Sequence, residues 1–359
     1  MKSVILTTGG TGGHIFPALV MAEELRRQYP GLRLKFVGSL YGPEKKLAEK
    51  KGIPFEGLPV RGFLGHGLHA LAAGGLMAAA LVRAAGIIRR FKPQIVAGFG
   101  GYAAFAPMLA AAILGVPCVL HEQNSIAGAS NRFLSKFSRR VCLSWPDTRS
   151  FARTKCVLTG NPVRADVCAV GREARQWSTR RLLVLGGSQG ARALNIFLPK
   201  ILPQLATTGV EIRHQSGKDG EAITRQAYKA AGYTPECVIA FIDDMAEAYR
   251  WADIAMCRAG ASTAAELCAA GLPSVLVPFP FAAHDHQTHN ARILENAGMA
   301  VLVPESELRS RNAGTLLLEL FEDTERRRQM SLAAMKTSRP YAAAKLAAVL
   351  EEVSNSHET

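Results

Sequence analysis

The stretch 258–290 carries the residue types that an anionic ligand requires. Residues 259–263 have no bulky side chain, and a helix pattern over 264–270 follows them and stops at Gly271. The first backbone N–H groups of a helix are unpaired and carry partial positive charge, so a phosphate is favoured beside them. Glu266 is expected in the first turn, where its carboxylate can accept hydrogen bonds from two neighbouring hydroxyls of a ribose.

A purely structural role for Glu266 remains open. Thr263 and Glu266 have the spacing of a T-x-x-E capping box, in which the two side chains satisfy N–H groups at the start of their own helix. A match this short is a hypothesis about structure as much as about binding. The spacing alone leaves both interpretations standing, a ribose contact and a helix cap.

Two glycine-rich loops each follow an apolar strand and precede a helix. Near the N-terminus a strand at 3–6 leads into the loop 7–13 and a helix at 15–28, and a second strand follows at 34–37. This β-α-β order predicts a parallel sheet. The pattern restarts at Arg181, and the repetition predicts an α/β fold with two Rossmann-like domains. Its second set comprises a strand at 182–185, a loop at 186–190 and a helix at 191–205.

Another predicted strand, 118–122, ends in the polar run His121-Glu122-Gln123-Asn124. A glycine loop, 98–102, follows the strand before it. Open α/β sheets bind ligands beyond the carboxyl ends of their strands. Ligand-binding side chains are therefore expected in these two places as well.

The glycine loops do not match the two commonest phosphate-binding motifs. Ile15 stands where the third glycine of G-x-G-x-x-G would be, and the second strand ends in Gly38-Ser39 without the acid that a dinucleotide requires. The P-loop pattern GxxxxGK[ST] is absent from the sequence. An NAD(P) oxidoreductase is therefore disfavoured.

Composition limits the class of protein further. The 359 residues suit two domains, and a net charge of +14 favours anionic partners such as nucleotide phosphates, nucleic acid or an anionic membrane. The seven cysteines are scattered and contain no C-x-x-C, which is typical of a reducing compartment. The first apolar run has five residues, which is too short for a signal peptide.

One apolar stretch, 68–88, follows a loop-like segment at 54–67 and contains a single charge, Arg83. Its uncharged part is shorter than the roughly 20 residues of a membrane span, and Gly74-Gly75 interrupts it. Apolar and basic side chains mixed in this way suit an anionic membrane surface, but a core helix with a basic end fits equally well. The residues concerned are Phe63, Leu64, Leu68, Leu71, Leu76 and Met77 among Arg61, Arg83, Arg89, Arg90 and Lys92.

Six motifs follow one another along the chain. They are GGTGGHIFPAL (9–19), GFGGYAAFAP (98–107), HEQNSIAG (121–128), GNPVR (160–164), GGSQGA (186–191) and DHQTHNA (285–291). No single motif is specific, but six in this order are. Through them the chain resembles, essentially end to end, the MurG family of B-type glycosyltransferases, the peptidoglycan UDP-GlcNAc:lipid I N-acetylglucosaminyltransferases.

The resemblance implies a reaction and an architecture. GlcNAc would pass from UDP-GlcNAc to the 4-hydroxyl of MurNAc-pentapeptide on undecaprenyl pyrophosphate (lipid I), with inversion, to give lipid II. Two parallel sheets would face each other across a cleft. Residues 1–161 would bind the lipid acceptor and the membrane, residues 162–339 would bind the donor, and the helix 340–359 would pack back on the first domain.

The resemblance also implies roles for particular side chains. His14 is the candidate base because imidazole titrates near neutrality, although it could instead only bind phosphate or backbone, and Glu122 is the alternative base. Arg164 would meet the charge of the nucleotide, unless it is only a surface residue of the linker, and Glu266 would bind the ribose. The other expected contacts are Thr11, Gly12 and Gly13 with a pyrophosphate of the donor or of the lipid; Ser188, Ala261, Ser262 and Thr263 with phosphates; Ile242 with uracil; and Asn124 and Gln287 with sugar hydroxyls.

No metal site is predicted. His284, His286 and His289 lie near Asp285, but nothing nearby completes a usual ligand set, and Asp243-Asp244 does not form a D-x-D signature. Loop and helix N–H groups can stabilise the leaving group instead. The family implies no required cofactor and a divalent cation only as an activator.

The expected partners are UDP-GlcNAc, lipid I and the anionic cytoplasmic face of the inner membrane, to which the protein would bind peripherally. Other cell-wall synthesis and division proteins are open candidates. The nearest alternative functions are a UDP-GlcNAc 2-epimerase and a glycolipid glucosyltransferase. A nucleic-acid-binding protein is disfavoured because the basic residues are dispersed.

Overall fold

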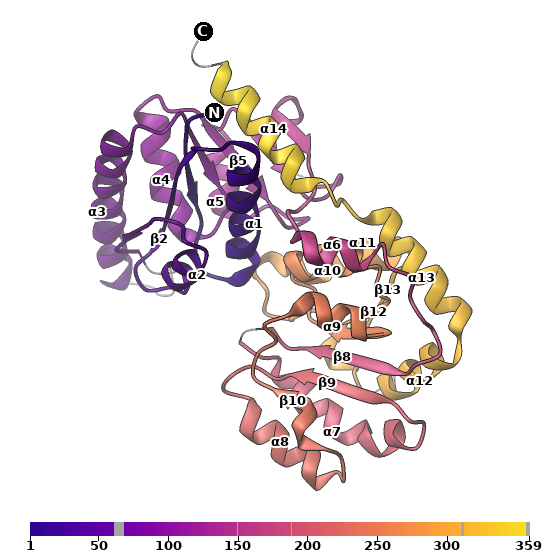
Figure 1. The fold of residues 1–359 in the computed structure, drawn as a ribbon. Helices are drawn as coiled ribbons and strands as arrows, with labels where there is room; N and C mark the ends of the chain where they lie inside the picture. The colour runs from indigo at the N-terminus through magenta and orange to yellow at the C-terminus, as the bar shows by residue number, and fades with distance from the viewer. Residues whose placement is uncertain (61–67, 149, 188, 310–311, 357–359) are drawn as a thin grey trace. The chain divides into compact units, whose positions relative to one another are not determined.

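A computed structural model describes residues 1–60, 68–148, 150–187, 189–309 and 312–356, with the backbone alone for 68–74. The chain forms two compact units (Figure 1). Unit 1 comprises Met1–Val163 and Tyr341–Thr359, and unit 2 comprises Arg164–Pro340. Each unit has its own wholly parallel sheet covered by helices, so the predicted α/β class with two parallel sheets is confirmed.

The sheet of unit 1 has seven parallel strands in the order β3-β2-β1-β4-β5-β6-β7. Its central strands are almost entirely buried, as the apolar runs of a sheet covered on both faces require. The strands are β1 (Ser3–Thr7), β2 (Arg33–Ser39), β3 (Phe55–Leu58), β4 (Ile95–Gly98), β5 (Cys118–Glu122), β6 (Arg140–Leu143) and β7 (Cys156–Leu158).

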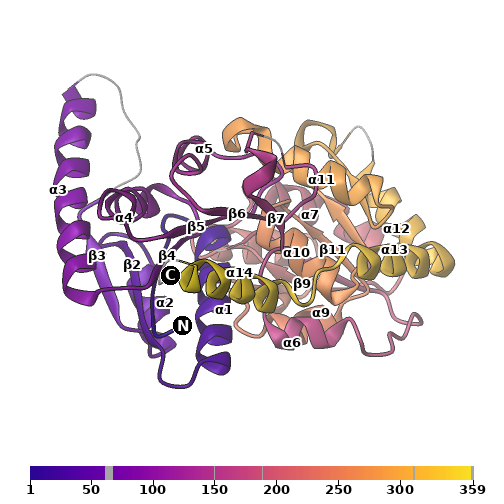
Figure 2. The same ribbon diagram turned by 90° about the horizontal axis from the view of Figure 1, so that it is seen from above.

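Helices cover both faces of this sheet (Figures 1 and 2). Successive strand residues point to opposite faces, so Val4 and Leu6 of β1 pack toward α1 and α14, while Ile5 packs toward α3 and α4. The C-terminal helix α14 lies against α1 and so belongs to unit 1. The helices of unit 1 are α1 (Gly12–Gln28), α2 (Glu44–Lys50), α3 (Leu68–Phe91), α4 (Tyr102–Ile113), α5 (Ala129–Leu134), η1 (Arg153–Lys155) and α14 (Ala342–Asn355).

The sheet of unit 2 has six parallel strands in the order β10-β9-β8-β11-β12-β13. Leu182 and Val184 of β8 enter an apolar core with residues of α7, α8 and α12. The strands are β8 (Arg181–Leu185), β9 (Glu211–Gln215), β10 (Val238–Ile239), β11 (Ile254–Cys257), β12 (Ser274–Leu276) and β13 (Ala300–Leu302).

The helices of unit 2 include several whose ends are fixed by polar side chains. Asp244 caps α9 by accepting a hydrogen bond from the Glu247 N–H at 2.9 Å, and Asp323 caps α13 in the same way. The helices are α6 (Ala165–Val170), α7 (Arg192–Ala206), α8 (Glu221–Ala230), η2 (Pro235–Cys237), α9 (Met245–Trp251), α10 (Ala261–Ala270), η3 (Ala283–Asp285), α11 (His286–Asn296), η4 (Glu305–Glu307), α12 (Ala313–Glu322) and α13 (Thr324–Thr337).

Both sheets have a point at which the strand order reverses, between β1 and β4 in unit 1 and between β8 and β11 in unit 2. The loops after these four strands leave the same edge of their sheet in opposite directions, which creates the usual ligand position of open α/β folds. The glycine loops after β1 and β8 and the small-residue loop after β11 all lie at these two points.

Two expectations about local structure are wrong. The segment 54–67 is not all loop, because Phe55–Leu58 pairs with β2 as an edge strand. Helix α3 continues through Gly74-Gly75, since an isolated pair of glycines only lowers helix propensity.

Candidate functional site

The first glycine loop is held by close backbone packing against the loop after β4. A Cβ on Gly101 would lie 1.9 Å from the Gly9 carbonyl oxygen, and one on Gly9 would lie 2.4 Å from the Ala103 Cβ. Gly101 also has a φ of 78°, a conformation that glycine adopts without strain. Gly9 and Gly101 therefore leave no room for a side chain where the two loops meet.

Helix α1 begins earlier than the sequence pattern indicates. Gly12 and Gly13 are its first two residues, and His14 is the third. Thr11, whose backbone is extended, precedes the helix, and its side chain does not cap it. Glu44, a buried carboxylate, accepts a hydrogen bond from the Gly10 N–H at 2.8 Å. The first turn thus presents backbone N–H groups and an imidazole, with no acidic residue among them.

The imidazole of His14 is joined to a chain of buried polar groups. Its Nδ1 lies 3.0 Å from Oε1 of Gln123, a side chain with no exposed surface. Gln123 Nε2 lies 2.9 Å from the Phe99 carbonyl oxygen and 3.0 Å from His121 Nδ1. His121 Nε2 lies 3.0 Å from the Gly160 carbonyl oxygen. Burial lowers the pKa of His121 to about 4, so this ring is neutral near pH 7.

Glu122, the alternative base, points away from this chain into its own loop. Its Oε1 accepts from the Asn124 N–H at 3.0 Å and from Asn124 Nδ2 at 3.3 Å. Its Oε2 accepts from Asn131 Nδ2 at 2.7 Å and from the Gly128 N–H at 3.3 Å. The carboxylate holds the turn that follows β5, and Asn124 takes part in the same contacts.

In unit 2, helix α10 begins at Ala261, three residues earlier than predicted. Gly260 precedes it as N-cap, so Ala261, Ser262 and Thr263 form the first turn. Glu266 is the sixth residue and lies in the second turn, and the helix has no side-chain cap. Both the first-turn placement of Glu266 and the capping-box alternative are therefore wrong.

The Glu266 carboxylate is bound by side chains from two other helices. Its Oε1 lies 3.2 Å from Nη2 of Arg164, the residue before α6, and its Oε2 accepts from the Tyr249 hydroxyl of α9 at 2.8 Å. The side chain is only 16% exposed. Burial raises the pKa of Glu266, while the Arg164 charge and the Tyr249 hydrogen bond oppose the rise. Burial also holds the pKa of Tyr249 well above its usual range, so the phenol remains a donor.

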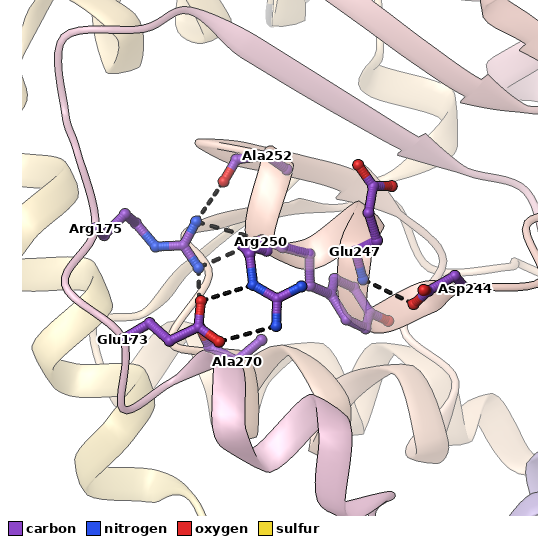
Figure 3. A network of polar contacts seen from close by, with 8 residues as sticks. Glu173, Arg175, Asp244, Glu247, Arg250, Ala252 and Ala270 are labelled. Carbon is purple, nitrogen blue, oxygen red and sulfur yellow. Dashed lines mark hydrogen bonds and ion pairs between the residues drawn. The ribbon is translucent and has the colours of Figure 1, made fainter.

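A second polar network joins the C-terminal ends of α9 and α10 (Figure 3). Arg175, in the connection after α6, donates to the carbonyl oxygens of Ala270 at 2.9 Å and Tyr249 at 3.3 Å, and also to that of Ala252. Arg250 and Glu173 form a two-bond ion pair beside it, at 2.6 and 2.8 Å. A guanidinium bound to the last carbonyls of two helices ties them together, which holds Tyr249 against Glu266.

The other predicted residues of unit 2 lie on separate elements. Ile242 is buried and borders a hollow of about 580 Å³ together with Phe241 and Trp251. Gln287, in the first turn of α11, accepts from the Phe279 N–H at 3.0 Å. Ser188 lies outside the described residues.

The histidines before and within α11 make separate contacts. His286 Nδ1 lies 2.7 Å from the Ala283 carbonyl oxygen, and His284 and Asp285 both have positive φ. Over the described ranges, no group of three or more His, Cys, Asp or Glu side chains has an arrangement that could hold a metal ion.

Gln123 lies in the polar run expected from the sequence but has no predicted role of its own, and Tyr249 is not among the predicted residues. A signal existed for Gln123, because the period of a strand places His121 and Gln123 on one face and Glu122 and Asn124 on the other. None existed for Tyr249, since only the crossing of α9 and α10 brings it to Glu266.

Comparisons with known proteins agree on one family. Residues 4–143 match the glycosyltransferase family 28 N-terminal domain, and residues 181–346 match the glycosyltransferase family 28 C-terminal domain. A protein of Nitratidesulfovibrio vulgaris (strain DP4) is 52% identical over 96% of this chain and 95% of its own length. It is named UDP-N-acetylglucosamine--N-acetylmuramyl-(pentapeptide) pyrophosphoryl-undecaprenol N-acetylglucosamine transferase.

Solved structures extend the comparison. The crystal structure of Acinetobacter baumannii MurG is similar with a TM-score of 0.76 and 33% identity, covering 98% of this chain and 100% of that one. A UDP-N-acetylglucosamine 2-epimerase has a TM-score of 0.66 at 14% identity, over 96% of this chain and 94% of its own. The second likeness shows a shared fold alone.

Proposed function

The chain belongs to the MurG family of glycosyltransferases, and from this premise we propose that it transfers GlcNAc from UDP-GlcNAc to lipid I, forming lipid II for peptidoglycan synthesis. The reaction inverts the anomeric carbon. The acceptor 4-hydroxyl oxygen forms a bond to that carbon while the bond to the UDP oxygen breaks. The electron pair of the broken bond leaves with UDP, and the hydroxyl proton goes to a base.

Unit 2 binds the donor in this proposal. The observation that carries this assignment is Glu266, a nearly buried carboxylate held between Arg164 and Tyr249 one turn after a small-residue helix start. Two hydroxyls of the ribose are its natural partners, because a carboxylate with two fixed oxygens accepts both. Arg164 then meets the charge of the nucleotide.

The phosphates and the base of the nucleotide occupy neighbouring elements. Ala261, Ser262 and Thr263 meet the phosphates at the start of α10, where the dipole of the helix stabilises negative charge. Ser188 contributes from the glycine loop after β8, and the backbone of Ile242 contacts uracil. Gln287 binds hydroxyls of the GlcNAc.

Unit 1 binds the acceptor and supplies the base. His14 takes the proton from the acceptor hydroxyl, and its ring is only half-buried at the start of α1. We assign this role to His14 rather than to Glu122, whose two oxygens accept four hydrogen bonds from the loop after β5 and from Asn131 of α5. Thr11, Gly12 and Gly13 bind a pyrophosphate, and Asn124 binds a sugar hydroxyl.

No metal is required in this scheme. The starts of two helices, α1 and α10, carry no acidic residue in the first turn and are suited to anionic groups. A divalent cation would act only as an activator.

We also propose that unit 1 binds peripherally to the anionic cytoplasmic face of the inner membrane. Leu76 and Val82 on α3 and Ile113 at the end of the neighbouring α4 are 42%, 75% and 67% exposed. Arg83 and Arg89 are exposed on α3 as well. Met77 is partly buried against the core, and the side chains at 61–74 lie outside the description. In the part of the chain that the structure covers, no helix is long and apolar enough to cross a bilayer.

Vesicle binding tests the membrane proposal. Replacing Val82 and Ile113 together with serine should weaken binding to anionic vesicles by about tenfold or more, because each loses an apolar side chain that would enter the interface. Ile223, 74% exposed on α8 of unit 2, provides the matched control, Ile223→Ser. If the two changes weaken vesicle binding equally, unit 1 is not the membrane-binding unit.

We also propose contacts with other cell-wall synthesis and division proteins.

The transfer reaction is tested with purified protein, radiolabelled UDP-GlcNAc and a short-chain lipid I. We expect labelled disaccharide-lipid and UDP in equal amounts. Release of UDP without transfer, or formation of UDP-ManNAc, would point to the epimerase and contradict the assignment of the acceptor.

A further inference from the structure

The chain of hydrogen bonds behind His14 is bounded by two backbone carbonyl groups, which can only accept hydrogen bonds. Phe99 and Gly160 contribute carbonyl oxygens, which accept hydrogen bonds and cannot donate them. Between them lie the side chains of Gln123 and His121, both essentially without exposed surface. Because water does not replace these partners, the two carbonyls determine the direction of every hydrogen bond in the chain.

The Phe99 carbonyl determines how the Gln123 amide is oriented. The amide atom 2.9 Å from this oxygen must be a donor, so it is the NH₂ group. The same NH₂ group lies 3.0 Å from His121 Nδ1. Gln123 Oε1 is therefore the atom that faces His14.

The end of the chain at Gly160 gives the same result independently. His121 Nε2 lies 3.0 Å from the Gly160 carbonyl and must carry its proton there. A neutral imidazole has one N–H, so His121 Nδ1 is left with a lone pair. That lone pair can only accept, and its partner is the Gln123 NH₂ group. Both ends of the chain thus require the same amide orientation.

The orientation has a direct consequence for His14. Gln123 Oε1 can only accept, and it lies 3.0 Å from His14 Nδ1, so Nδ1 carries the proton. In the neutral ring this leaves the lone pair on Nε2. Nε2 is the nitrogen that must be unprotonated if His14 is to remove a proton from a hydroxyl.

We propose that Gln123 is a positioning residue that holds His14 in the tautomer protonated on Nδ1, with His121 fixing the orientation of Gln123 in turn. The proposal rests on the assignment of His14 as the base. During transfer His14 Nε2 gains the proton of the acceptor hydroxyl as its oxygen bonds to the anomeric carbon, and the Nδ1–H continues to donate to Gln123 Oε1. No proton leaves Nδ1, so Gln123 and His121 keep their own protons throughout.

The surroundings favour a fixed orientation of this chain. The Trp145 indole donates to the Gln123 backbone carbonyl at 3.1 Å, and the Phe99 ring lies 5.5 Å from the His121 ring between centroids. A Cβ on Gly100 would lie 3.3 Å from His14 Nδ1, so a larger residue there would crowd the ring. The His14 ring is thus held by one hydrogen bond, and glycine at position 100 leaves room for Nδ1.

The tautomer can be measured without any turnover. In the full-length protein with ¹⁵N-labelled histidine, the two ring nitrogens of His14 have distinct NMR shifts and can be assigned by loss of their signals in His14→Gln. The proposal predicts an Nδ1–H and an unprotonated Nε2 in the neutral ring. A neutral ring protonated on Nε2 would overturn it, whatever the kinetics.

Kinetics then test whether the tautomer matters. With UDP-GlcNAc and short-chain lipid I, Gln123→Met should lower kcat by about tenfold to a hundredfold and leave the KM for UDP-GlcNAc within about twofold. In a His14→Gln background the same change should have no further effect, because the base is already absent. An equal loss in both backgrounds would show that Gln123 acts independently of His14.

Two controls separate the possible failures. Gln28→Met removes an amide that bonds Glu24 within α1, the helix that carries His14, and should leave kcat unchanged. If His14→Gln retains full kcat, the assignment of the base fails while the NMR result still decides the tautomer. If Gln123→Met does not fold, as its melting curve would reveal, the NMR measurement on the unaltered protein remains decisive.

Discussion

The two units share a strand plan but differ in the polar groups buried where the strand order reverses. In each, a glycine loop follows the first strand, and a helix without a side-chain cap starts at the point where the strand order reverses. In unit 1 the side chains linked to the imidazole of His14, those of Gln123 and His121, are neutral. In unit 2 the carboxylate of Glu266 is paired with the charge of Arg164. The fold supplies the position, and the residues supply the function.

The difference follows from the cost of burying charge. A neutral amide and a neutral imidazole are stable in the interior once each hydrogen bond is satisfied. A buried carboxylate is stabilised by hydrogen-bond donors or by an opposite charge: Glu122 accepts from four neutral N–H donors, whereas Glu266 is paired with Arg164. This difference supports the proposal that unit 1 moves the proton and unit 2 holds the nucleotide.

The largest effect is expected for a substitution in unit 1 that removes the proposed base. His14→Gln should lower kcat by about a hundredfold to ten-thousandfold, the range for loss of a general base, with the KM for UDP-GlcNAc nearly unchanged. Steady-state transfer assays measure both. His289→Gln, an exposed histidine on α11, is the control and should behave as the unaltered protein. A large rise in KM with kcat retained would instead make His14 a binding residue.

The corresponding change in unit 2 should affect binding. Glu266→Gln should raise the KM for UDP-GlcNAc by about tenfold to a hundredfold, since hydrogen bonds to a charged acceptor contribute about 1.5–3 kcal/mol each. The matched control is Glu173→Gln, which breaks the more exposed ion pair with Arg250 in Figure 3. Similar KM values for the two variants would remove Glu266 from the ribose site.

Acid should weaken both units, because each buries a neutral histidine. Burial lowers the pKa of His121 to about 4 and that of His214 to about 3 from the ordinary 6.5. Below pH 6.5 the unfolded chain binds more protons, so stability falls as the pH falls, and above 6.5 these groups have no effect. The expected slope is about 1.4 kcal/mol per pH unit for each histidine.

Hydrogen exchange in β5 and β9, corrected for the intrinsic effect of pH, follows this loss in each unit separately. Protection that stays constant in either strand between pH 6.5 and pH 4.5 would contradict a neutral buried histidine there. If protection is lost in only one of the two strands, only that unit buries a neutral histidine.

The smallest effect is expected in unit 2, when Glu266 loses one of its two hydrogen-bond partners. Tyr249→Phe removes the hydrogen bond to Glu266 Oε2, which is worth about 1 kcal/mol, and should raise the KM for UDP-GlcNAc roughly fivefold with kcat unchanged. The buried ring keeps its packing, so the melting temperature should change little. A KM equal to that of the unaltered protein would mean that Arg164 alone orients the carboxylate.

Much of the fold could be predicted because its strands are short apolar runs between glycine loops. Strand β5 begins and ends where expected, at Cys118 and Glu122. Strand β3 was missed, because an edge strand of four residues between Pro54 and a glycine-rich segment has no distinct period. The sequence pattern places the starts of α1 and α10 three residues too late, because small residues suit a loop and a first helical turn alike.

The site was less predictable, because its contacts join distant parts of the chain. Arg164 and Glu266 are 102 residues apart, and His14 and Gln123 are 109 apart. Motifs indicate which residues belong to a site but not which atoms meet. Only the folded chain distinguishes Glu122, which binds Asn131 of α5, from Gln123, which contacts His14.

The affinity for UDP, measured by calorimetry in the His14→Gln and Glu266→Gln variants, tests the division of labour most directly. We expect His14→Gln to bind UDP as tightly as the unaltered protein, and Glu266→Gln to bind it about tenfold to a hundredfold more weakly. Equal weakening by both changes, or tight binding by Glu266→Gln, would contradict the assignment of the nucleotide to unit 2 and of the proton to unit 1.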